Sequence, residues 1–474
     1  MTDDLTIAGR TVSPRQTLVP LALAQFICSF AGSNMNVMIN DISKDLDTTV
    51  KGVQTTITMF LLVMAALMIA GSKLTDRWGR KRCFILGLAV YGVGALASAI
   101  APGIGVLFLG NSIFEGVGSA LLIPPVYILT TLIFTDLTSR ARAFGLISGM
   151  GGVGAATGPL IGGLITTAIS WRVAFLFQAA VIVTILFLSR SIVDPLEPDP
   201  TRPFDLVGAI LSALGMVFVV IGILEADTNL FLTAVFIALG GAFLVWFFLY
   251  IRSVERAGKE PLLSTSLFRN RTSNLGLVTQ NVQWLMLLGV SFVVSVFLQI
   301  VRGYNAIETG LVFTSATVGI LVSSLAAERL ARKYAQRTLI VAGFIGTIAG
   351  IVLLVASVRV SPSVFAFPPG LLLIGLGVGV MLTPSVNVVQ SAFPEERQGE
   401  ISGVSRSVSN LGSSLGTAIA GTILVAAVSS GNRAYVYAML TLAFIGLIGL
   451  VASLFLPANP EPTPSGSVEG TGLG

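Results

Sequence analysis

The amino-acid sequence predicts an all-α polytopic membrane protein, and three observations lead to this prediction. The chain of 474 residues is 54% hydrophobic and only 11% charged, whereas a soluble protein carries about 25% charged residues. Its apolar runs reach about 20 residues, the length of a helix that crosses a bilayer. Short basic segments separate the runs, as in the cytoplasmic loops of membrane proteins. Because most basic residues lie in these loops, the net charge of +5 gives no reason to expect nucleic-acid binding.

Counting about 20 apolar residues for each crossing gives fourteen predicted membrane helices. They run near residues 17–39, 53–72, 83–101, 104–134, 142–168, 171–191, 206–224, 229–251, 274–300, 306–327, 338–357, 364–390, 401–428 and 434–456. The fourth span is too long for one straight crossing, and Pro124 and Pro125 offer a place for a kink.

The distribution of Lys and Arg predicts that both termini lie in the cytoplasm. With the termini there, six of the 28 Lys and Arg residues fall outside the cell, namely Lys44, Lys51, Arg172, Arg302, Arg359 and Arg433. A shift of the frame by one span would invert this bias, which supports an even number of spans. We therefore expect a multi-pass protein of the inner (plasma) membrane.

The order of spans and loops predicts two six-helix halves separated by two extra helices. The expected parts are a cytoplasmic N-terminal segment (1–16), an N-terminal half (17–191), a linker region with two extra helices (192–273), a C-terminal half (274–456) and a disordered cytoplasmic tail (457–474). Short patterns recur at nearly one spacing, since Gly158 and Gly162 are echoed by Gly412 and Gly416. Such parallel repeats imply two halves that face each other across a central cavity.

The most distinctive segment lies between the second and third predicted spans and reads Gly71-Ser72-Lys73-Leu74-Thr75-Asp76-Arg77-Trp78-Gly79-Arg80-Lys81-Arg82. It is short and dense in charge, and we expect it to form a turn. Its five Lys and Arg residues against one Asp indicate the cytoplasmic side. From charge alone it could be no more than an orientation anchor.

The order of Gly71, Asp76, Arg77, Gly79 and Arg80 also resembles the loop between helices 2 and 3 of the major facilitator superfamily. The resemblance implies the major facilitator fold and a secondary transporter whose halves rock about a site near the middle of the membrane. It implies that this loop helps to lock the inner gate. Asp76 would pair with the start of a neighbouring helix, and Arg77 and Arg80 would bind local carboxylates or helix ends.

A second motif, Gly154-Ala155-Ala156-Thr157-Gly158-Pro159-Leu160-Ile161-Gly162-Gly163, lies in the fifth predicted span. Glycines four residues apart, at Gly154, Gly158 and Gly162, make a groove where another helix can pack closely, and Pro159 interrupts the helix hydrogen bonds. Ordinary tight packing would explain the same pattern. The motif also resembles the hinge-forming antiporter motif of exporters in this superfamily, and it therefore implies efflux rather than uptake.

The fourteen spans, with Phe204-Asp205-Leu206-Val207-Gly208 opening the seventh, resemble the fourteen-helix drug:proton antiporter family of that superfamily. Two positions depart from the family pattern. Ala31 stands where the first helix often carries Asp, and Asn111 stands where the fourth helix often carries an Arg implicated in proton transfer. The usual coupling residues are therefore missing.

Glu115 is the first candidate for proton coupling. It lies eleven residues from the outer end of its predicted span, which is roughly 16 Å and close to the midplane. Burial in hydrocarbon favours the neutral form of a carboxyl group, which suits a group that binds and releases a proton. Glu115 could instead be a structural hydrogen-bond hub for neighbouring asparagines. Asp41, at the membrane boundary, is the second candidate.

Amide and aromatic side chains are the candidate contacts for a cargo molecule. They are Asn34, Asn36, Asn111, Gln280 and Trp284. The three asparagines are expected in the outer half of the cavity, if helices 1 and 4 line it. Gln280 and Trp284 are four residues apart and can share one face of the ninth span. Arg406 is expected to be a cytoplasmic anchor at the start of the thirteenth span.

The sequence shows no ATP-binding loop, metal cluster or catalytic nucleophile, and it contains no histidine. We therefore expect no enzyme activity, metal or cofactor, with the proton gradient as the driving force. The first hypothesis is a proton-coupled exporter of amphipathic or lipophilic compounds, cationic or zwitterionic if the buried carboxyl sets the preference. The expected partners are a small-molecule or lipid-like substrate, protons and membrane lipids, and we expect a monomer. The alternatives are an exporter of one specific lipid or secreted metabolite, and a transport-inactive sensor or scaffold.

Overall fold

The computed structural model describes residues 5–7, 10–12, 14–134, 137–331, 333–360, 363–393, 397–426 and 432–458. The predicted disordered tail lies outside the described residues from residue 459 onward. In these ranges, fourteen helices are long and apolar enough to cross a membrane. This finding confirms the predicted number of spans and the helical fold class.

Six spans form the N-terminal half, and three of them change helix type along their length. The segments are α1 (Pro14–Asn34), η1 (Met35–Met38) and α2 (Ile39–Asp45) in span 1, α3 (Val50–Trp78) in span 2, α4 (Arg80–Ala99) in span 3, α5 (Ile104–Leu107), η2 (Phe108–Glu115) and α6 (Gly116–Ile133) in span 4, α7 (Leu137–Ala168) in span 5, and α8 (Trp171–Leu188) with η3 (Ser189–Ser191) in span 6. The short η1 is a 3₁₀-helix, and η2 is a π-helix.

The remaining spans begin with the two extra helices and end with the C-terminal half. They are α9 (Leu206–Leu224), α10 (Leu230–Arg256), α11 (Arg271–Val296) with the π-helix η5 (Phe297–Val301), α12 (Ala306–Ala331), α13 (Gln336–Val360), α14 (Pro368–Gln390) preceded by η6 (Val364–Ala366), α15 (Gln398–Ala426) and α16 (Asn432–Leu454). One further short helix, η4 (Thr265–Arg269), lies between α10 and α11.

Two short strands precede the helices and are absent from the all-α prediction. The strands β1 (Leu5–Ile7) and β2 (Arg10–Val12) pair in antiparallel fashion, with Leu5 opposite Val12. Thr, Ile and Val in these segments are β-branched and therefore suit extended backbone.

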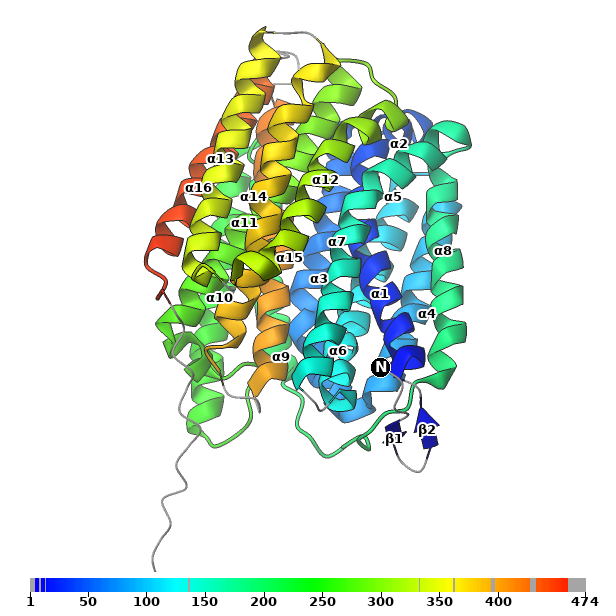
Figure 1. Ribbon diagram of the computed structural model, residues 1–474, viewed down its shortest axis with the longest axis vertical. Helices are drawn as coiled ribbons and strands as arrows, with labels where there is room; N and C mark the ends of the chain where they lie inside the picture. Colours follow the sequence, from blue (N-terminus) through cyan, green and yellow to red (C-terminus); the bar gives the residue numbers. More distant parts are fainter. Residues whose placement is uncertain are drawn as a thin grey trace, which may run out of the picture.

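The helices run side by side between two ends of the molecule (Figure 1). We call the end with the α3–α4 junction and the start of α1 the lower end, and the opposite end, with α2 and α5, the upper end (Figure 1). The six Lys and Arg residues predicted to lie outside the cell are all at or next to helix ends of the upper end.

The junction between spans 2 and 3 is a single glycine rather than the predicted turn. α3 continues through Trp78, and α4 begins at Arg80. Gly79 alone breaks the helix, with a φ of 93° that residues with a side chain rarely adopt. The charged residues do not end α3 because Lys and Arg favour helix wherever water can solvate their charges.

Span 4 departs from α-helix at η2, not at the predicted kink. α6 runs continuously through Pro124 and Pro125. Pro124 has no N–H, so it cannot donate to the carbonyl oxygen of Ala120. That oxygen lies against Gly71 of α3, where an added Cβ would come within 2.2 Å of it. The close glycine contact covers the exposed carbonyl and helps α6 to continue.

Glycines make close backbone contacts in both halves, where α7 packs on α1 and α15 packs on α11. A Cβ at Gly154 of α7 would lie 2.3 Å from the carbonyl oxygen of Phe26 in α1. In the C-terminal half, a Cβ at Gly416 of α15 would lie 2.1 Å from the carbonyl oxygen of Leu285 in α11. Within each half, glycines therefore let two helix backbones touch, as small residues do in membrane proteins.

The two halves meet along two pairs of helices, α3 with α15 and α7 with α12. Hydroxyl groups of one half donate to backbone carbonyls of the other across both seams. The Ser407 hydroxyl donates to the Ala65 carbonyl at 2.7 Å, and the Thr317 hydroxyl donates to the Ala156 carbonyl at 2.7 Å. These bonds use small side chains and main-chain acceptors, so they leave the facing backbones close together.

The extra helix α9 covers the α3–α15 seam. Leu62 of α3, Val220 of α9 and Ala418 of α15 belong to one buried apolar cluster. At the upper end, Lys51 of α3 forms an ion pair with Asp227, in the turn between α9 and α10, at 2.7 Å. The linker region therefore contacts both halves.

We predict that Gly154→Ala destabilises the protein, because the new methyl group would overlap the Phe26 carbonyl oxygen and force α7 away from α1. Overpacking of this kind costs about 1–3 kcal/mol. The matched control is Gly152→Ala on the same helix, where no atom lies within 4 Å of an added Cβ. Thermal unfolding in detergent should show a lower midpoint for Gly154→Ala only. Equal midpoints would contradict the backbone contact.

Candidate functional site

Two adjoining cavities lie near the lower end of the molecule. The larger, which we call the lower vestibule, has a volume of about 820 Å³, within the range of cavities that hold small-molecule ligands. Its lining includes Lys73, Asp76, Arg202, Lys259, Arg397 and Glu400. The smaller, which we call the Arg406 pocket, has a volume of about 30 Å³. Ser72 and Ile128 line both cavities, so the smaller one continues from the larger.

The Arg406 pocket lies where the two halves meet. Arg406 of α15 donates a hydrogen bond to the hydroxyl of Tyr127 on α6, and its Cζ lies 4.5 Å from the centre of the Tyr127 ring. The Tyr127 hydroxyl donates in turn to the Gln25 Oε1 of α1 at 3.1 Å. A chain of three polar side chains therefore joins spans 1, 4 and 13.

The sequence predicts that Arg406 is an anchor at the start of its helix, but the structure places it further along the helix. α15 begins at Gln398, and eight residues of rise place Arg406 about 12 Å into the helix. The prediction fails because the polar residues from Gln398 to Ser402 are helical beside the lower vestibule. A hydropathy count places the helix start later, where the apolar run begins.

Glu115 lies inside the N-terminal half and lines neither of these cavities. It is the last residue of the π-helix η2 and is fully buried. The Ser98 hydroxyl donates to its Oε1 at 3.5 Å, and the Asn111 Nδ2 donates to its Oε2 at 3.3 Å. The Tyr91 hydroxyl, which lies next to Glu115, donates to the Gln178 Oε1 at 2.6 Å. Glu115 is therefore surrounded by hydrogen-bond donors from α4 and its own span.

The five predicted cargo contacts do not gather around these cavities. Asn111 bonds Glu115 inside the N-terminal half, and Asn34 packs against Gly162 of α7. Gln280 is buried between α11 and α15, where its Oε1 accepts from the Ser405 hydroxyl at 2.7 Å. Trp284 is half-buried and packs against the apolar core. Asn36 lies at the upper end. None of the five lines the lower vestibule or the Arg406 pocket.

A group of hydrogen bonds, which we call the latch, joins spans 1 and 9 toward the upper end. The Gln299 Nε2 donates to the Asn36 carbonyl at 2.8 Å, and the Asn40 N–H donates to the Gln299 Oε1 at 3.0 Å. The Asn36 Nδ2 donates to the Ser291 hydroxyl at 3.2 Å. The latch forms where span 1 is 3₁₀-helical and span 9 is π-helical. At such irregular backbone, N–H and C=O groups that a regular α-helix would pair internally can bond other helices.

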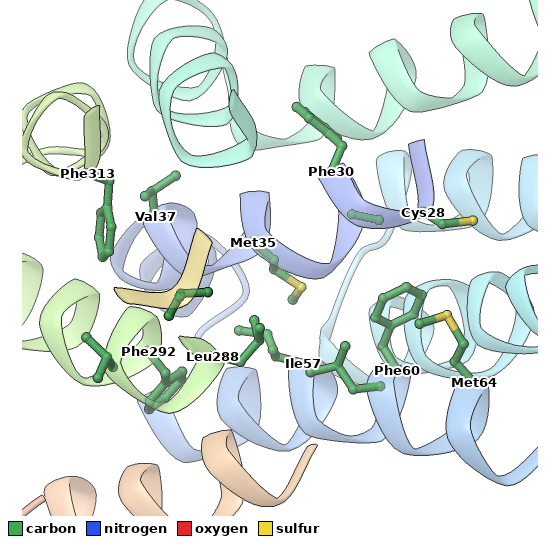
Figure 2. Packing of buried hydrophobic residues seen from close by; sticks show 14 of the residues in the cluster. Cys28, Phe30, Met35, Val37, Ile57, Phe60, Met64, Leu288, Phe292 and Phe313 are labelled. Atoms are coloured by element: carbon green, nitrogen blue, oxygen red, sulfur yellow. The ribbon is translucent and has the colours of Figure 1, made fainter. Parts of the chain in front are cut away.

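An apolar plug lies beside the latch. Figure 2 shows Met35 and Val37 of η1 near Ile57 of α3, Phe292 of α11 and Phe313 of α12. All five belong to one buried cluster that takes residues from both halves. The plug therefore packs apolar side chains of both halves against each other beside the latch.

The motif at the α3–α4 junction is held by the linker. The Asp76 carboxylate pairs with Arg80 at 2.7 Å and with Arg202 of the linker at 3.1 Å. Asp76 therefore binds two arginines, and one of them, Arg80, is the first residue of the neighbouring helix α4. The Asp194 Oδ2 accepts from the backbone N–H groups of Arg80 and Lys81, at 2.7 and 3.3 Å. That carboxylate caps the N-terminus of α4, as expected for an anion at a helix start.

The other motif residues lie close to this junction or at the upper end. Arg77 is half-exposed on the last turn of α3. Asp41 is half-buried on α2, away from the lower cavities. Trp171 and Arg172 both donate to the carboxylate of Asp45, which joins the upper ends of spans 1 and 6.

We predict that Gln299→Ala opens the upper end, because it removes the two bonds to Asn36 and Asn40. Two net hydrogen bonds are worth about 2 kcal/mol, or roughly thirtyfold in the equilibrium between closed and open states. Pulsed electron spin resonance between labels at Lys44 and Phe365, both exposed at the upper end, should report a longer distance.

The control is Gln283→Ala, which changes the same residue type on the same helix. The Gln283 Oε1 accepts from Ser385 within the C-terminal half, so its loss should leave the label distance unchanged. Labelling uses a background in which Cys28 and Cys83 are replaced by alanine, since both carry free thiols. An unchanged distance in Gln299→Ala would refute the latch.

The chain was compared with known families and proteins. A family model described as Major Facilitator Superfamily matches residues 21–269, 203–417 and 281–472. The puromycin resistance protein pur8 of Streptomyces alboniger is 30% identical over 418 residues, which cover 87% of this chain and 82% of the relative. The multidrug efflux pump LfrA of Mycolicibacterium smegmatis is 30% identical and covers 78% of this chain and 72% of the relative.

Among solved structures, a POT family transporter in complex with a thioalcohol-conjugated peptide has a TM-score of 0.70 at 15% identity. The match covers 95% of this chain and 97% of that one. This likeness shows a shared fold. The matched ranges, the relatives and the fourteen spans together identify the protein: it belongs to the Major Facilitator Superfamily, and within it to the fourteen-helix drug:proton antiporter family.

Proposed function

We propose that the protein exports amphipathic or lipophilic compounds from the bacterial cytoplasm in exchange for protons, by alternating access. One observation carries the proposal: the vestibule of about 820 Å³ lies at the lower end, while the latch and the plug join the two halves toward the upper end. This arrangement is expected of an alternating-access carrier whose binding cavity is open to one side of the membrane. Relatives named as drug efflux and resistance proteins support the cargo class.

The lower end faces the cytoplasm in this proposal. The excess of Lys and Arg at that end agrees with the positive-inside rule. Both termini would then be cytoplasmic, and the protein would sit in the plasma membrane. A single chain contains both halves and both cavities, which supports a monomer as the working unit. Since the family consists of transporters, cargo would leave chemically unchanged.

The halves would rock against each other along the α3–α15 and α7–α12 seams. The bonds across these seams run from small hydroxyl groups to carbonyl oxygens, so a modest shift exchanges one acceptor for another at little cost. Gly154, Gly158 and Gly162, with Pro159, would form the hinge surface of α7 against α1. Each half would move as a unit because its own helices are packed backbone to backbone.

The α3–α4 junction would act as the inner gate. In the present state Asp76 binds Arg80 and Arg202, which ties the linker to the N-terminal half. When the lower end closes, the start of α15 would approach this junction, and Asp76 could exchange Arg202 for the new partner. Gly71 and Gly79 would keep the junction compact, and Arg77 would contact neighbouring carboxylates.

Glu115 would bind the transported proton without touching cargo. Ser98 and Asn111 donate to its two oxygens, which stabilises the charged form. Protonation would turn one oxygen into a donor and would break one of these bonds. Because Glu115 ends a π-helix, the resulting adjustment could change the helix type of span 4 and shift α6. Asp41, near the upper end, is the second candidate for this role.

We predict that Glu115→Gln uncouples transport from the proton gradient. Glutamine has the same shape and can still accept a hydrogen bond, but it cannot bind and release a proton. In proteoliposomes loaded with one amphipathic dye at a time, from a set of anionic, neutral and cationic dyes that includes ethidium, wild type should move at least one dye under an imposed pH gradient. The variant should lose at least 90% of this gradient-driven flux and keep exchange of labelled for unlabelled dye.

The control for this experiment is Glu197→Gln, which removes an exposed carboxylate of the linker and should leave both readouts at the wild-type level. Full gradient-driven flux in Glu115→Gln would show that Glu115 does not couple the proton. Glu115 would then be a structural hydrogen-bond hub, and Asp41 would be the next candidate for proton coupling. Absence of any gradient-driven flux in wild type, for every compound of a broad panel, would count against the proposed export and favour a sensor or scaffold.

A second candidate function is the export of one secreted metabolite. A relative named as a probable actinorhodin transporter of Streptomyces coelicolor, 26% identical over 416 residues, favours it. The two candidates differ in breadth. A drug exporter should be inhibited by many unrelated amphipathic compounds, whereas a dedicated carrier should be inhibited by close chemical relatives of one compound.

A further inference from the structure

The charge that faces the cavity between the halves is positive. Arg406 lines the smaller pocket, whereas Glu115 lies inside the N-terminal half and lines neither cavity. A preference for cationic cargo would need a carboxylate in that pocket. Its lining instead combines Arg406 and Tyr127 with hydroxyl and apolar side chains, among them Met68, Ile123 and Thr131.

The guanidinium of Arg406 has no carboxylate partner in the described part of the chain. Arg80, Arg172, Arg202 and Arg397 each have an Asp or Glu within 4 Å. For Arg406 the described residues provide the Tyr127 hydroxyl and the face of the Tyr127 ring. A guanidinium has five N–H donors, so most of its hydrogen-bonding capacity remains for another molecule.

Tyr127 orients Arg406 but cannot neutralise its charge. The tyrosine hydroxyl donates to Gln25 and accepts from Arg406, and its ring packs on Phe144 with centres 5.9 Å apart. This ring is therefore fixed and holds the guanidinium at the pocket. An uncompensated cation in a dry interior is costly, so closing the pocket around Arg406 becomes easier once an anion neutralises it.

The lower vestibule leads to the pocket and carries further unpaired cations. Lys73 and Lys259 line it, and neither has a carboxylate within 4 Å in the described ranges. Of its acidic residues, Glu400 pairs with Arg397, and Glu255 accepts from the Ser264 hydroxyl. The lining also includes Asp76 and Glu260, so five Lys and Arg residues face four Asp and Glu residues. The formal charge of the entrance is therefore +1, which attracts anions weakly.

We propose that Arg406, with Tyr127, forms a subsite for the anionic group of an amphipathic cargo, such as a carboxylate, phenolate or sulfonate attached to an apolar ring. The inference rests on the proposed function, since it assigns a cargo class to the same cavity. The guanidinium binds the anionic oxygens through its free N–H groups, and the apolar side chains contact the ring. Binding neutralises the charge at the seam and favours closure of the lower end.

Binding of matched probes to the full-length protein in phosphatidylcholine nanodiscs tests the subsite. Naphthalene-2-sulfonate is the anion, naphthalene-2-sulfonamide is the neutral molecule of the same shape, and 2-naphthylmethylammonium is the cation. Empty nanodiscs correct for partition into lipid. Wild type should bind the anion at least tenfold more tightly than the other two probes. Equal binding of all three, or a preference for the cation, would overturn the proposal.

Two Arg406 variants and one control identify the group responsible. Arg406→Gln should weaken anion binding at least tenfold and remove the preference over the sulfonamide, and Arg406→Lys should keep part of it. Arg433→Gln, which removes an exposed arginine at the upper end, should bind as wild type does. An undiminished preference for the anion in Arg406→Gln would overturn the assignment. If that variant does not fold, the preference of wild type and of Arg406→Lys decides the matter.

A last arm separates a lipid headgroup from a soluble cargo. Nanodiscs containing phosphatidylglycerol should not compete for the subsite if the anion is a soluble cargo, and Arg406-dependent competition would assign the subsite to a lipid and overturn the cargo assignment. The binding readout needs neither flux nor a proton gradient. If wild type shows the anion preference but no gradient-driven flux, the proposed function alone is refuted. If wild type shows the flux but no anion preference, the subsite alone is refuted.

Discussion

The contact of helix backbones at glycine is the constraint on which the rest of the structure depends. In a bilayer, apolar side chains gain little by leaving lipid for protein, so helices associate through close packing and hydrogen bonds. Gly154 and Gly416 bring α7 onto α1 and α15 onto α11 at distances that any Cβ would prevent. Each half is consequently rigid. The seams between the halves add hydroxyl-to-carbonyl bonds, and the α7–α12 seam also has a glycine contact, at Gly310 against the Pro159 carbonyl.

Breaks in the helices determine where polar groups can sit in the apolar interior. Asn36 lies in a 3₁₀-helix, Gln299 in a π-helix, and Glu115 at the end of another π-helix. Irregular backbone is tolerated at membrane depth only where protein buries it. At the upper end this irregularity supplies the carbonyl and N–H that Gln299 binds. The irregular backbone of spans 1 and 9 therefore interrupts the regular helix and provides a contact between the halves.

Glu115 is fully buried and Arg406 is half-buried, and these two charged residues lie in different halves with different surroundings. Glu115 is enclosed by donors within the N-terminal half, and Arg406 of the C-terminal half reaches the cavity. Span 4 connects them, since Glu115 ends η2 and Tyr127 lies twelve residues further along the same span, about 18 Å away. A proton on Glu115 and an anion on Arg406 would act on the same helix. Physical coupling of proton and cargo would then need no direct contact between them.

The number and order of the membrane helices were determined by the sequence alone. Hydrocarbon requires about 20 apolar residues for each crossing, and this requirement is local. The resemblance of the Gly71–Arg80 and Gly154–Gly163 segments to known motifs pointed to the family for a similar reason, because each motif is continuous in the chain.

The site depended on contacts between residues far apart in the chain, and only the tertiary structure decided them. The pattern of Gly154, Gly158 and Gly162 predicted a packing groove, but not that α1 fills it. Glu115 was correctly placed as a buried carboxyl, yet its neighbours on α4 direct it away from the cavity. Arg406 looked like an anchor because hydropathy cannot tell a polar helical turn beside a cavity from a loop. Where a side chain points depends on which helix lies opposite, and that is a property of the assembled fold.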